Sequence, residues 1–502
     1  MKAMKKYLML LVMMALCTIA FACSSSNDET EAPQEVFSVS AQSLKFPSAG
    51  GMESLLVSAN KGSVACTSGD SWLKVERVSQ GVGKTGFNVI CDANTAYESR
   101  TAEIKVSVDG VVKATVNVEQ EAASKPVVTE TGLLGVGWNL GNQMDSHNNG
   151  VAGETAWGNP KATQATFDAV KKAGFTSVRI PVTWMGHVGK APEYKIEEAW
   201  LNRVAELVGY AEKAGLKAIV NIHHDGGDSK YWLDIVNAAK SESKNTEVKA
   251  QLKAMWTQIA EKFKNTGDFL MFESMNEIQD GKWGWGANRT DGGKQYKVLN
   301  EWQQTFVDAV RAVGGKNSDR WLGVCGYSAN PDLTMENLKI PDDNTKGRLM
   351  VSVHDYGPTE YTLECKYSEW GHTGAADKKA PGNVNEDYFK NLFQKLKTTF
   401  VDKGYPVYIG ETGNCYRGDA RAELFRKYFL EYVAKAARTY GLSVILWDNG
   451  TKNAGRECHG YFDHATGAYL NNAEEMVKAF VKGYTDNSTG YTLQSVYDNA
   501  PK

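Results

Sequence analysis

Two stretches organise this chain: Phe272-Glu-Ser-Met-Asn-Glu277 and Tyr408-Ile-Gly-Glu-Thr-Gly413. Each follows apolar residues and carries a carboxylate where the apolar run stops. Apolar runs of this length predict β-strands, so we expect Glu277 and Glu411 at the C-terminal ends of two strands. Taken singly, either glutamate is equally well explained as a structural ion-pair partner of a neighbouring Lys or Arg. The rest of the chain must distinguish between the two explanations.

Residues 131–495 alternate strand-like runs with amphipathic helices. In one such helix Trp200, Val204 and Leu207 fall on a single face. The strand-like runs are Leu133–Leu140, Ser177–Val182, Lys217–His223, Phe269–Asn276, Trp321–Tyr327, Leu349–His354, Val407–Gly410 and Ser443–Trp447. Eight strands separated by helices predict an α/β fold, a (β/α)₈ barrel, although periodicity alone does not exclude a doubly wound sheet.

Polar side chains collect where these predicted strands end. They are Arg179, His223, His224, Asn276, Glu277, His354, Tyr356, Glu411 and Trp447. The C-terminal strand ends of such a barrel form one face, and active sites lie there. Two carboxylates that face one cleft are the minimum for hydrolysing a glycosidic bond, because one protonates the leaving oxygen and the other attacks or activates water.

Eight short motifs follow one another through the same region. They are Gly137-Trp-Asn-Leu-Gly-Asn142, Trp157-Gly-Asn-Pro160, Val178-Arg-Ile-Pro-Val182, Asn221-Ile-His-His-Asp225, Met275-Asn-Glu277, His354-Asp-Tyr356, Gly410-Glu411 and Leu446-Trp447. Together they resemble glycoside hydrolase family 5, most closely its subfamily 4. The sequence departs from that pattern at residues 143–147, where Gln-Met-Asp-Ser-His replaces the commoner Thr-Leu-Asp-Ala, and at Ile278, where Pro often stands.

The resemblance implies a retaining mechanism with Glu277 as acid/base and Glu411 as nucleophile. One side chain cannot serve both roles, because the acid must hold a proton while the nucleophile is ionised. Arg179 and Tyr356 are implied to hydrogen-bond Glu411 and to favour its charged form. The remaining implied substrate-binding residues are Asn139, His223, His224, Asn276, His354 and Trp447, with Asn276 at the sugar 2-hydroxyl and Trp447 stacked under the sugar.

The expected function is that of an endo-β-1,4-glucanase acting on a β-glucan polysaccharide such as xyloglucan, mixed-linkage glucan or carboxymethyl cellulose, without a cofactor or a metal. Candidate aromatic platforms in the cleft are Trp138, Trp157, Trp184, Trp232, Trp283 and Trp285, some of which must be core. A β-mannanase and a non-catalytic surface glycan-binding protein remain alternatives. A metal site at His223-His-Asp225 lacks an evident third ligand. An esterase elbow at residues 326–330 lacks its second glycine.

The start of the chain indicates export. Residues 1–22 combine early lysines with an apolar run from Tyr7 to Phe21, followed by Ala22, which predicts a cleaved signal peptide. Cys23 follows in a context that resembles a bacterial lipobox, so we expect a lipid on Cys23, anchoring at the outer membrane and a position on the cell surface. Residues 23–35 form an acidic polar spacer.

Residues 36–122 alternate apolar and polar positions in six short runs, with no helical segment between them. This spacing predicts a small immunoglobulin-like β-sandwich. Ser71-Trp-Leu73, Arg100-Thr-Ala102 and Val116-Asn-Val-Glu-Gln120 resemble a BACON domain, a module often found before carbohydrate-active enzymes. Trp72 is expected in its core, so we favour a spacer over a sugar-binding role. Residues 123–130 are the expected linker.

The composition of the chain limits its number of domains and the classes of partner that it can bind. The 502 residues, of which 42% are hydrophobic, have room for two or three domains, and the net charge of −3 argues against a nucleic-acid partner. We expect a monomer. Cys66, Cys91 and Cys325 are predicted to be buried free thiols, while one disulfide among Cys365, Cys415 and Cys458 is possible in an oxidising compartment.

Overall fold

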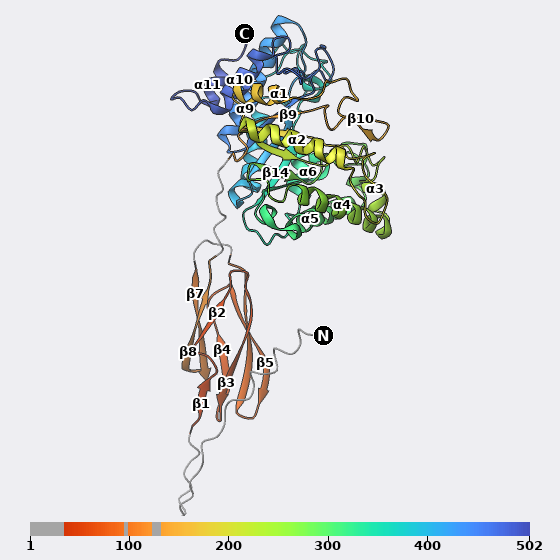
Figure 1. The fold of residues 1–502 in the computed structure, drawn as a ribbon. Helices are drawn as coiled ribbons and strands as arrows, with labels where there is room; N and C mark the ends of the chain where they lie inside the picture. The colour runs from red at the N-terminus through yellow and green to blue at the C-terminus, as the bar shows by residue number, and fades with distance from the viewer. Residues whose placement is uncertain (1–34, 95–98, 123–131) are drawn as a thin grey trace, which may run out of the picture. The chain divides into compact units, whose positions relative to one another are not determined.

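The computed structural model describes residues 35–94, 99–122 and 132–502, which divide into two compact units (Figure 1). The predicted signal at 1–22, the lipidated Cys23, most of the spacer at 23–35 and the linker at 123–130 lie outside the described residues. Among the described helices, none combines the length and the apolar character needed to cross a membrane. Each unit has a hydrophobic core of its own.

The first unit is a sandwich of two four-stranded sheets, ordered β1-β3-β6-β5 and β2-β8-β7-β4. Its strands are β1 (Phe37–Val39), β2 (Ser43–Phe46), β3 (Gly51–Ala59), β4 (Val64–Thr67), β5 (Leu73–Gly81), β6 (Lys84–Cys91), β7 (Arg100–Val108) and β8 (Val111–Gln120). Alternate residues of β7, including Ile104 and Val106, are buried between the sheets. The fold class is as predicted. Six of its strands were expected; β2 and β4, of four residues each, were not.

The second unit is a closed barrel of eight parallel strands in the order β12-β13-β14-β15-β16-β17-β18-β9. The barrel strands are β9 (Val136–Leu140), β12 (Ser177–Ile180), β13 (Lys217–Val220), β14 (Leu270–Glu273), β15 (Leu322–Cys325), β16 (Leu349–His354), β17 (Val407–Thr412) and β18 (Ser443–Asp448). Each overlaps one predicted run. Parallel strands are buried on both faces, which is why these runs were almost continuously apolar.

Helices surround the barrel (Figure 1). They are α1 (Gln164–Lys172), α2 (Glu198–Ala214), α3 (Ile235–Ala238), α4 (Glu242–Lys262), α5 (Lys294–Val313), α6 (Pro331–Asn337), α7 (Thr359–Thr362), α8 (Glu386–Thr399), α9 (Ala420–Thr439), α10 (Ala473–Thr485) and α11 (Leu493–Asp498). The short strands β10 (His147–Asn148) and β11 (Val151–Ala152) form a hairpin in the loop after β9. The main core lies between the strands and the surrounding helices.

All six described cysteines outside the first 34 residues are free thiols, so the structure holds no disulfide among Cys365, Cys415 and Cys458. Cys66, Cys91 and Cys325 are buried, as predicted. Trp72 is half-buried against the sandwich core, and the Arg100 guanidinium lies 4.3 Å from the centre of its ring. Trp72 is therefore part of the packing of the first unit.

Candidate active site

Side chains inside the barrel change from apolar to polar along the strands. The apolar layer, near the start of the strands, contains Ile219, Met271, Met350, Tyr408 and Ile445. Alternate residues of a strand face the same side, so the next inward positions of β14 and β16 are Glu273 and Ser352. The Ser352 hydroxyl donates to Glu273 Oε1 at 2.7 Å. The polar layer thus lies toward the C-terminal ends of the strands.

Arg179 occupies the middle of this polar layer and has no exposed surface. Its Nε donates to Glu273 Oε2 at 2.8 Å, and its Nη1 donates to Glu411 Oε1 at 2.8 Å. Nη1 also donates to Asn139 Oδ1 at 3.0 Å, and Nη2 donates to Asn276 Oδ1 at 2.8 Å. Burial opposes the charge on Arg179, but the two carboxylates raise its pKa. One guanidinium therefore balances two buried acids and orients four side chains.

The two predicted acids meet in this layer. Glu411, at the end of β17, is buried and accepts a hydrogen bond from the Tyr356 hydroxyl at 3.0 Å. Glu277 follows β14, with 18% of its side chain exposed, and its Oε1 lies 2.7 Å from His354 Nδ1. One oxygen of Glu277, one of Glu411 and a nitrogen of His354 lie within 4.8 Å of one another. Acids this close suit direct attack, since an inverting pair must leave room for water at about 6.5 to 9.5 Å.

Two neighbours of Glu411 have raised pKa values. Burial, followed by the charge of Glu411, raises the pKa of Tyr356 well above its usual range, so the phenol stays a hydrogen-bond donor. Burial opposes a charge on His354, but Glu411 and Glu277 together raise the pKa of its imidazole. Both groups therefore stabilise negative charge on the acids that they contact.

The pKa of His223 is shifted in the opposite direction to that of His354. Asn221 Nδ2 lies 3.1 Å from His223 Nδ1, which makes Nδ1 the acceptor and leaves the proton on Nε2, 3.9 Å from Glu411 Oε1. Burial, together with the charges of His224 and Arg179, holds the pKa of His223 well below its usual range. His223 is thus a neutral donor that faces the nucleophile position.

His224 is held by a carboxylate from another loop. Its Nε2 lies 3.7 Å from Asp145 Oδ2, and although burial opposes the charge, Asp145 raises the pKa of His224. Asp145 is placed by the backbone N–H groups of Asn142 and Gln143, which donate to its two oxygens. With 32% of its side chain exposed, His224 is partly accessible to solvent.

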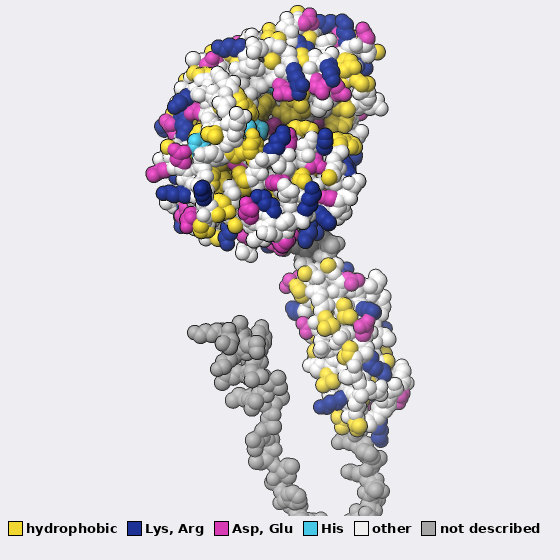
Figure 2. All heavy atoms as spheres, turned by 90° about the vertical axis from the view of Figure 1, so that its right-hand side faces the viewer, with side chains coloured by type: hydrophobic (Ala, Val, Ile, Leu, Met, Phe, Trp, Pro, Cys, Tyr) yellow, Lys and Arg dark blue, Asp and Glu magenta, His cyan; other side chains and the backbone are white. Residues whose placement is uncertain are grey.

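The tryptophans divide into core and surface. Trp138 and Trp184 are fully buried, so these two predicted platforms are core; Trp138 Nε1 donates to Asp448 Oδ2 at 2.8 Å. Trp447 is half-buried, and its ring lies parallel to the His223 ring with centres 6.0 Å apart. The exposed ones are Trp157 at 42%, Trp283 at 56% and Trp285 at 80%. Figure 2 shows a hollowed face of this unit where hydrophobic and histidine side chains gather.

Asn139 takes a different place from the one expected. We predicted a substrate contact, but Asn139 has no exposed surface. Its Oδ1 accepts from Arg179, and its Nδ2 donates to the Gly410 carbonyl at 2.8 Å. Asn139 therefore orients Arg179 and ties β9 to the residue before the nucleophile. Arg179, also expected to bind substrate, is likewise fully buried and acts through Glu411 and Asn276.

Sequence reasoning missed Glu273. This buried glutamate bonds Arg179, Asn221 Nδ2 at 2.9 Å and the Tyr408 hydroxyl at 2.8 Å. Burial opposes its charge, but Arg179 and then His354 lower its pKa. A charged residue at an inward position of a predicted barrel strand was the available signal, since such a residue needs partners from other strands.

Two groups of described side chains offer ligand atoms close enough for a metal ion: Asp145 with His223 and His224, and Glu277 with His354 and Glu411. The first corrects the expectation from sequence that the histidine pair has no third ligand; Asp145 supplies it from the loop after β9. The second group consists of the acid pair and His354. In this group His354 bonds Glu277, and Arg179 and Tyr356 bond Glu411.

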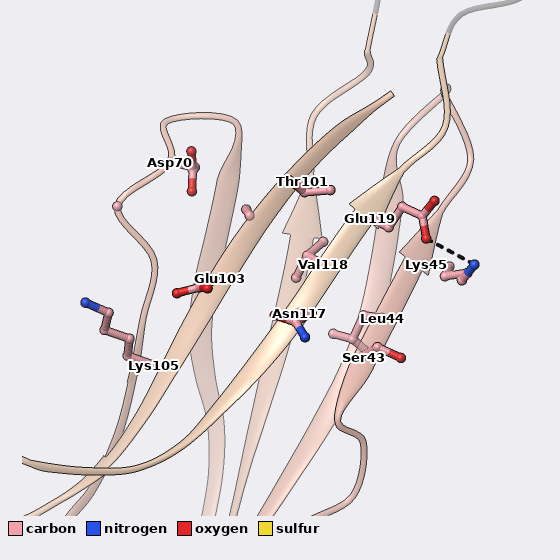
Figure 3. A pocket seen from close by; sticks show the side chains of 12 residues that line it. Ser43, Leu44, Lys45, Asp70, Thr101, Glu103, Lys105, Asn117, Val118 and Glu119 are labelled. Atoms are coloured by element: carbon pink, nitrogen blue, oxygen red, sulfur yellow. Dashed lines mark ion pairs between the residues drawn. The ribbon is translucent and has the colours of Figure 1, made fainter. Parts of the chain in front are cut away.

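The sandwich unit has a shallow hollow of about 700 Å³ over the sheet that contains β2, β7 and β8 (Figure 3). Its lining combines charged and polar side chains with the aliphatic Leu44 and Val118, and it includes the ion pair of Lys45 with Glu119 at 3.0 Å. No aromatic side chain belongs to the lining. Sugar rings are usually bound by stacking on aromatic faces, which this hollow does not offer.

A (β/α)₈ barrel that brings two carboxylates together from its fourth and seventh strands defines a glycoside hydrolase. Residues 142–453 match the family described as cellulase (glycosyl hydrolase family 5), and residues 62–121 match the BACON family, described as a putative N-terminal binding domain. The chain therefore belongs to glycosyl hydrolase family 5, as the sequence motifs indicated.

Relatives of known activity extend this assignment. The chain is 30% identical to the xyloglucan-specific endo-beta-1,4-glucanase BoGH5A of Bacteroides ovatus, over 94% of this chain and 95% of that protein. It is 57% identical to the solved GH5-4 broad specificity endoglucanase from Bacteroides salanitronis, with a TM-score of 0.70 over 72% of this chain and 97% of that one. A solved Bacteroidetes-affiliated GH5 cellulase linked with a polysaccharide utilization locus is 51% identical, with a TM-score of 0.72 over 74% of this chain and 96% of that one.

Proposed function

We propose that this glycoside hydrolase is a retaining endo-β-1,4-glucanase that cleaves internal bonds of xyloglucan and related soluble β-glucans. The observation that carries the proposal is the pair of Glu277 and Glu411, whose oxygens lie within 4.8 Å. The xyloglucan specificity of BoGH5A and the broad specificity of the Bacteroides salanitronis endoglucanase support the substrate class. A β-mannanase remains an alternative that the ranking of substrates below tests.

In the first step Glu411 attacks the anomeric carbon and Glu277 gives its proton to the glycosidic oxygen, which leaves with the rest of the chain. In the second step Glu277 takes a proton from water, and the resulting hydroxide displaces Glu411 from the glycosyl ester. His354 holds Glu277 during both transfers. Asn276 presents its NH₂ group to the sugar 2-hydroxyl, because Arg179 occupies its oxygen. Trp447 lies under the reacting sugar.

The test combines substrate ranking with chemical rescue. We expect reducing-sugar release from tamarind xyloglucan, barley β-glucan and carboxymethyl cellulose, more than from glucomannan, and none from the Glu411→Ala variant. Azide added to Glu411→Ala should yield an α-glycosyl azide. With an activated substrate, azide added to Glu277→Ala should yield a β-glycosyl azide, because it then attacks the enzyme ester. No sugar release from any glucan, or azides of the opposite configuration, would overturn the proposal.

We also propose that the chain is exported, lipidated on Cys23 and anchored at the outer-membrane surface. There it would be a monomer, with the BACON domain as a spacer between the membrane and the barrel. The early lysines, the apolar run and the acidic spacer support this placement. In whole cells, Cys23→Ser should move the protein from the membrane fraction to the soluble fraction. Equal membrane retention of both forms would contradict the anchor.

A further inference from the structure

One end of the sandwich unit collects exposed valines. Seven of the twelve large hydrophobic side chains that are exposed among the described residues belong to this unit, although the barrel unit is by far the larger. Four of the seven lie where strands begin or turn at one end of the sandwich: Val36, Val82, Val111 and Val112. We call this region the valine end (Figure 1); it comprises residues 35–37, 59–64, 81–84 and 108–113. Single exposed apolar side chains are normal, but a group of them marks an interaction surface.

Backbone pairing and one ion pair bring the valines to the same end of both sheets. The Asn60 N–H, just after β3, donates to the Val36 carbonyl at 3.3 Å. Val82 lies in the turn between β5 and β6, and the start of β6 pairs with the end of β3. In the second sheet, Lys113 on β8 extends its Nζ to within 3.2 Å of Glu35 Oε1. The valine end is therefore one continuous end of the sandwich.

Val82 occupies a position that turn chemistry does not favour. With Gly83 it forms the two-residue turn between β5 and β6, and its side chain is fully exposed. Such turns favour Asn, Asp and Gly. The neighbouring turn between β7 and β8 follows that preference with Asp109-Gly110. A valine at the outermost point of a turn gains no packing within its own unit, so only a partner can bury it.

Lysines accompany the valines. Lys61, Lys84 and Lys113 are exposed at the valine end, where the exposed carboxylates are Glu35 and Asp109. One of the two carboxylates, Glu35, is already paired with Lys113. Apolar side chains among lysines match a bilayer surface, because its interior accepts the apolar groups and anionic lipid headgroups attract the cations.

The sequence keeps this surface close to the proposed anchor. Glu35, at the valine end, is twelve residues after Cys23. A flexible connection of that length has a root-mean-square span of about 20 Å. A surface tethered at such a distance meets its partner at an effective concentration in the millimolar range, so weak contacts are enough. The strand β8 leads about 33 Å away from the valine end, and the chain continues from there toward the barrel unit.

We propose that the valine end docks on the membrane, with its valines in the headgroup region of an anionic bilayer and Lys61 and Lys84 on lipid phosphates. The inference rests on the proposed lipid anchor, which brings the sandwich to the membrane, and adds a second contact that orients it. Docking directs the opposite end of the sandwich, from which the chain continues to the barrel unit, away from the bilayer.

The experiment measures vesicle binding without the lipid anchor. A chain that begins at Ser24 keeps both units and lacks the apolar signal and Cys23. In flotation assays we expect this chain to bind vesicles of equal parts phosphatidylglycerol and phosphatidylcholine, and to bind phosphatidylcholine alone far more weakly. High salt should release it from the anionic vesicles. Lys61→Ala and Lys84→Ala should each lower the partition coefficient about fivefold.

The apolar contribution needs its own variant and a matched control. Val82→Asn with Val111→Thr suits a turn and a strand, so the fold is kept, and the pair should lower the partition coefficient about tenfold. Met52 is 59% exposed on β3 at the opposite end of the same sandwich. Met52→Gln should therefore leave vesicle binding unchanged.

Three results would overturn the proposal: no binding of the Ser24 chain to anionic vesicles, an unchanged partition coefficient in the double valine variant, or an equal loss in Met52→Gln. A concentration-dependent dimer that the valine variant abolishes, without vesicle binding, would assign the surface to a second copy of the chain instead. The assay contains no glucan and no lipid on the protein. Its outcome is therefore separate from the tests of hydrolysis and of the Cys23 anchor.

Discussion

One arginine supports two of the three acids in the site's polar layer. Arg179 bonds Glu273 and Glu411, which lie on β14 and β17 and are both almost completely buried. A buried carboxylate without a partner is very costly, so the two acids depend on the same guanidinium. Burial at this position makes Arg179 part of the stability of the barrel as well as part of its chemistry.

Replacing Arg179 tests this dependence. We expect Arg179→Met to lower the free energy of unfolding by about 3 to 5 kcal/mol, because Glu273 and Glu411 lose their shared counter-charge. Adding Glu273→Gln to this variant should recover part of the loss, since one unpaired charge disappears. Urea unfolding of the two single variants and the double variant measures the coupling. Strictly additive losses would contradict a shared counter-charge.

Among the described barrel strands, β17 is the one that pairs irregularly with both of its neighbours. Its register shifts against β16 between Val353 and His354, and against β18 between Ile409 and Thr412. These shifts place Glu411 opposite His354, which is how irregular pairing commonly redirects a side chain next to an active site. Gly410 makes room for the arrangement, because a Cβ there would lie 2.9 Å from His354 Nε2.

Gly410→Ala should therefore push His354 away from Glu277. We expect kcat to fall at least tenfold on whichever glucan the wild type hydrolyses best, because the acid loses its orienting partner. Gly209→Ala in α2 is the control: no atom lies within 4 Å of the added methyl, so kcat should stay the same while the free energy of unfolding rises by about 0.5 to 1 kcal/mol. An unaltered kcat in Gly410→Ala would show that the glycine has no role in placing His354.

The chain folds into two units, each with its own core. Buried histidines in the barrel unit make its stability depend on pH. Burial, then Arg426, lowers the pKa of His459 to about 3, and burial also holds the pKa of His223 low. The unfolded chain binds these protons near pH 6.5, whereas the folded barrel does not. Their contribution to stability is present above pH 6.5 and is lost as the pH falls. His354, with its raised pKa, contributes stability below pH 6.5 that is lost as the pH rises through its folded pKa.

The loss of unfolding free energy toward acid pH can be measured. Between pH 6.5 and pH 4 each histidine that stays neutral in the folded state should remove about 1.4 kcal/mol of unfolding free energy per pH unit. His459→Gln, which keeps a donor for the Thr362 carbonyl, should reduce the slope by about one proton. Urea midpoints recorded from pH 4 to pH 7 give the slope. An identical slope in the variant would mean that His459 is not held neutral by the fold.

Much of this organisation is visible in the linear pattern. All eight barrel strands were predicted, because strands buried on both faces require continuous apolar runs, and the acids stand where those runs stop. The sandwich strands β2 and β4, of four residues each, were missed. Glu273 was missed because a single glutamate in a strand shows its partners only after distant strands pair.

The order of residues predicted eight strands, the face on which their C-terminal ends would meet, and the positions of Glu277 and Glu411 at two of those ends, because periodicity and strand ends are local properties. Only the folded structure established that Arg179 joins Glu273 to Glu411 and that Asn139 orients Arg179. The same is true of the contact between Asp145 and His224, and of the burial of Trp138 and Trp184 in the core. Those contacts join residues far apart in the chain; Arg179 and Glu411 are 232 positions apart. A local pattern tells which way a side chain faces, whereas its partner depends on the closure of the whole barrel.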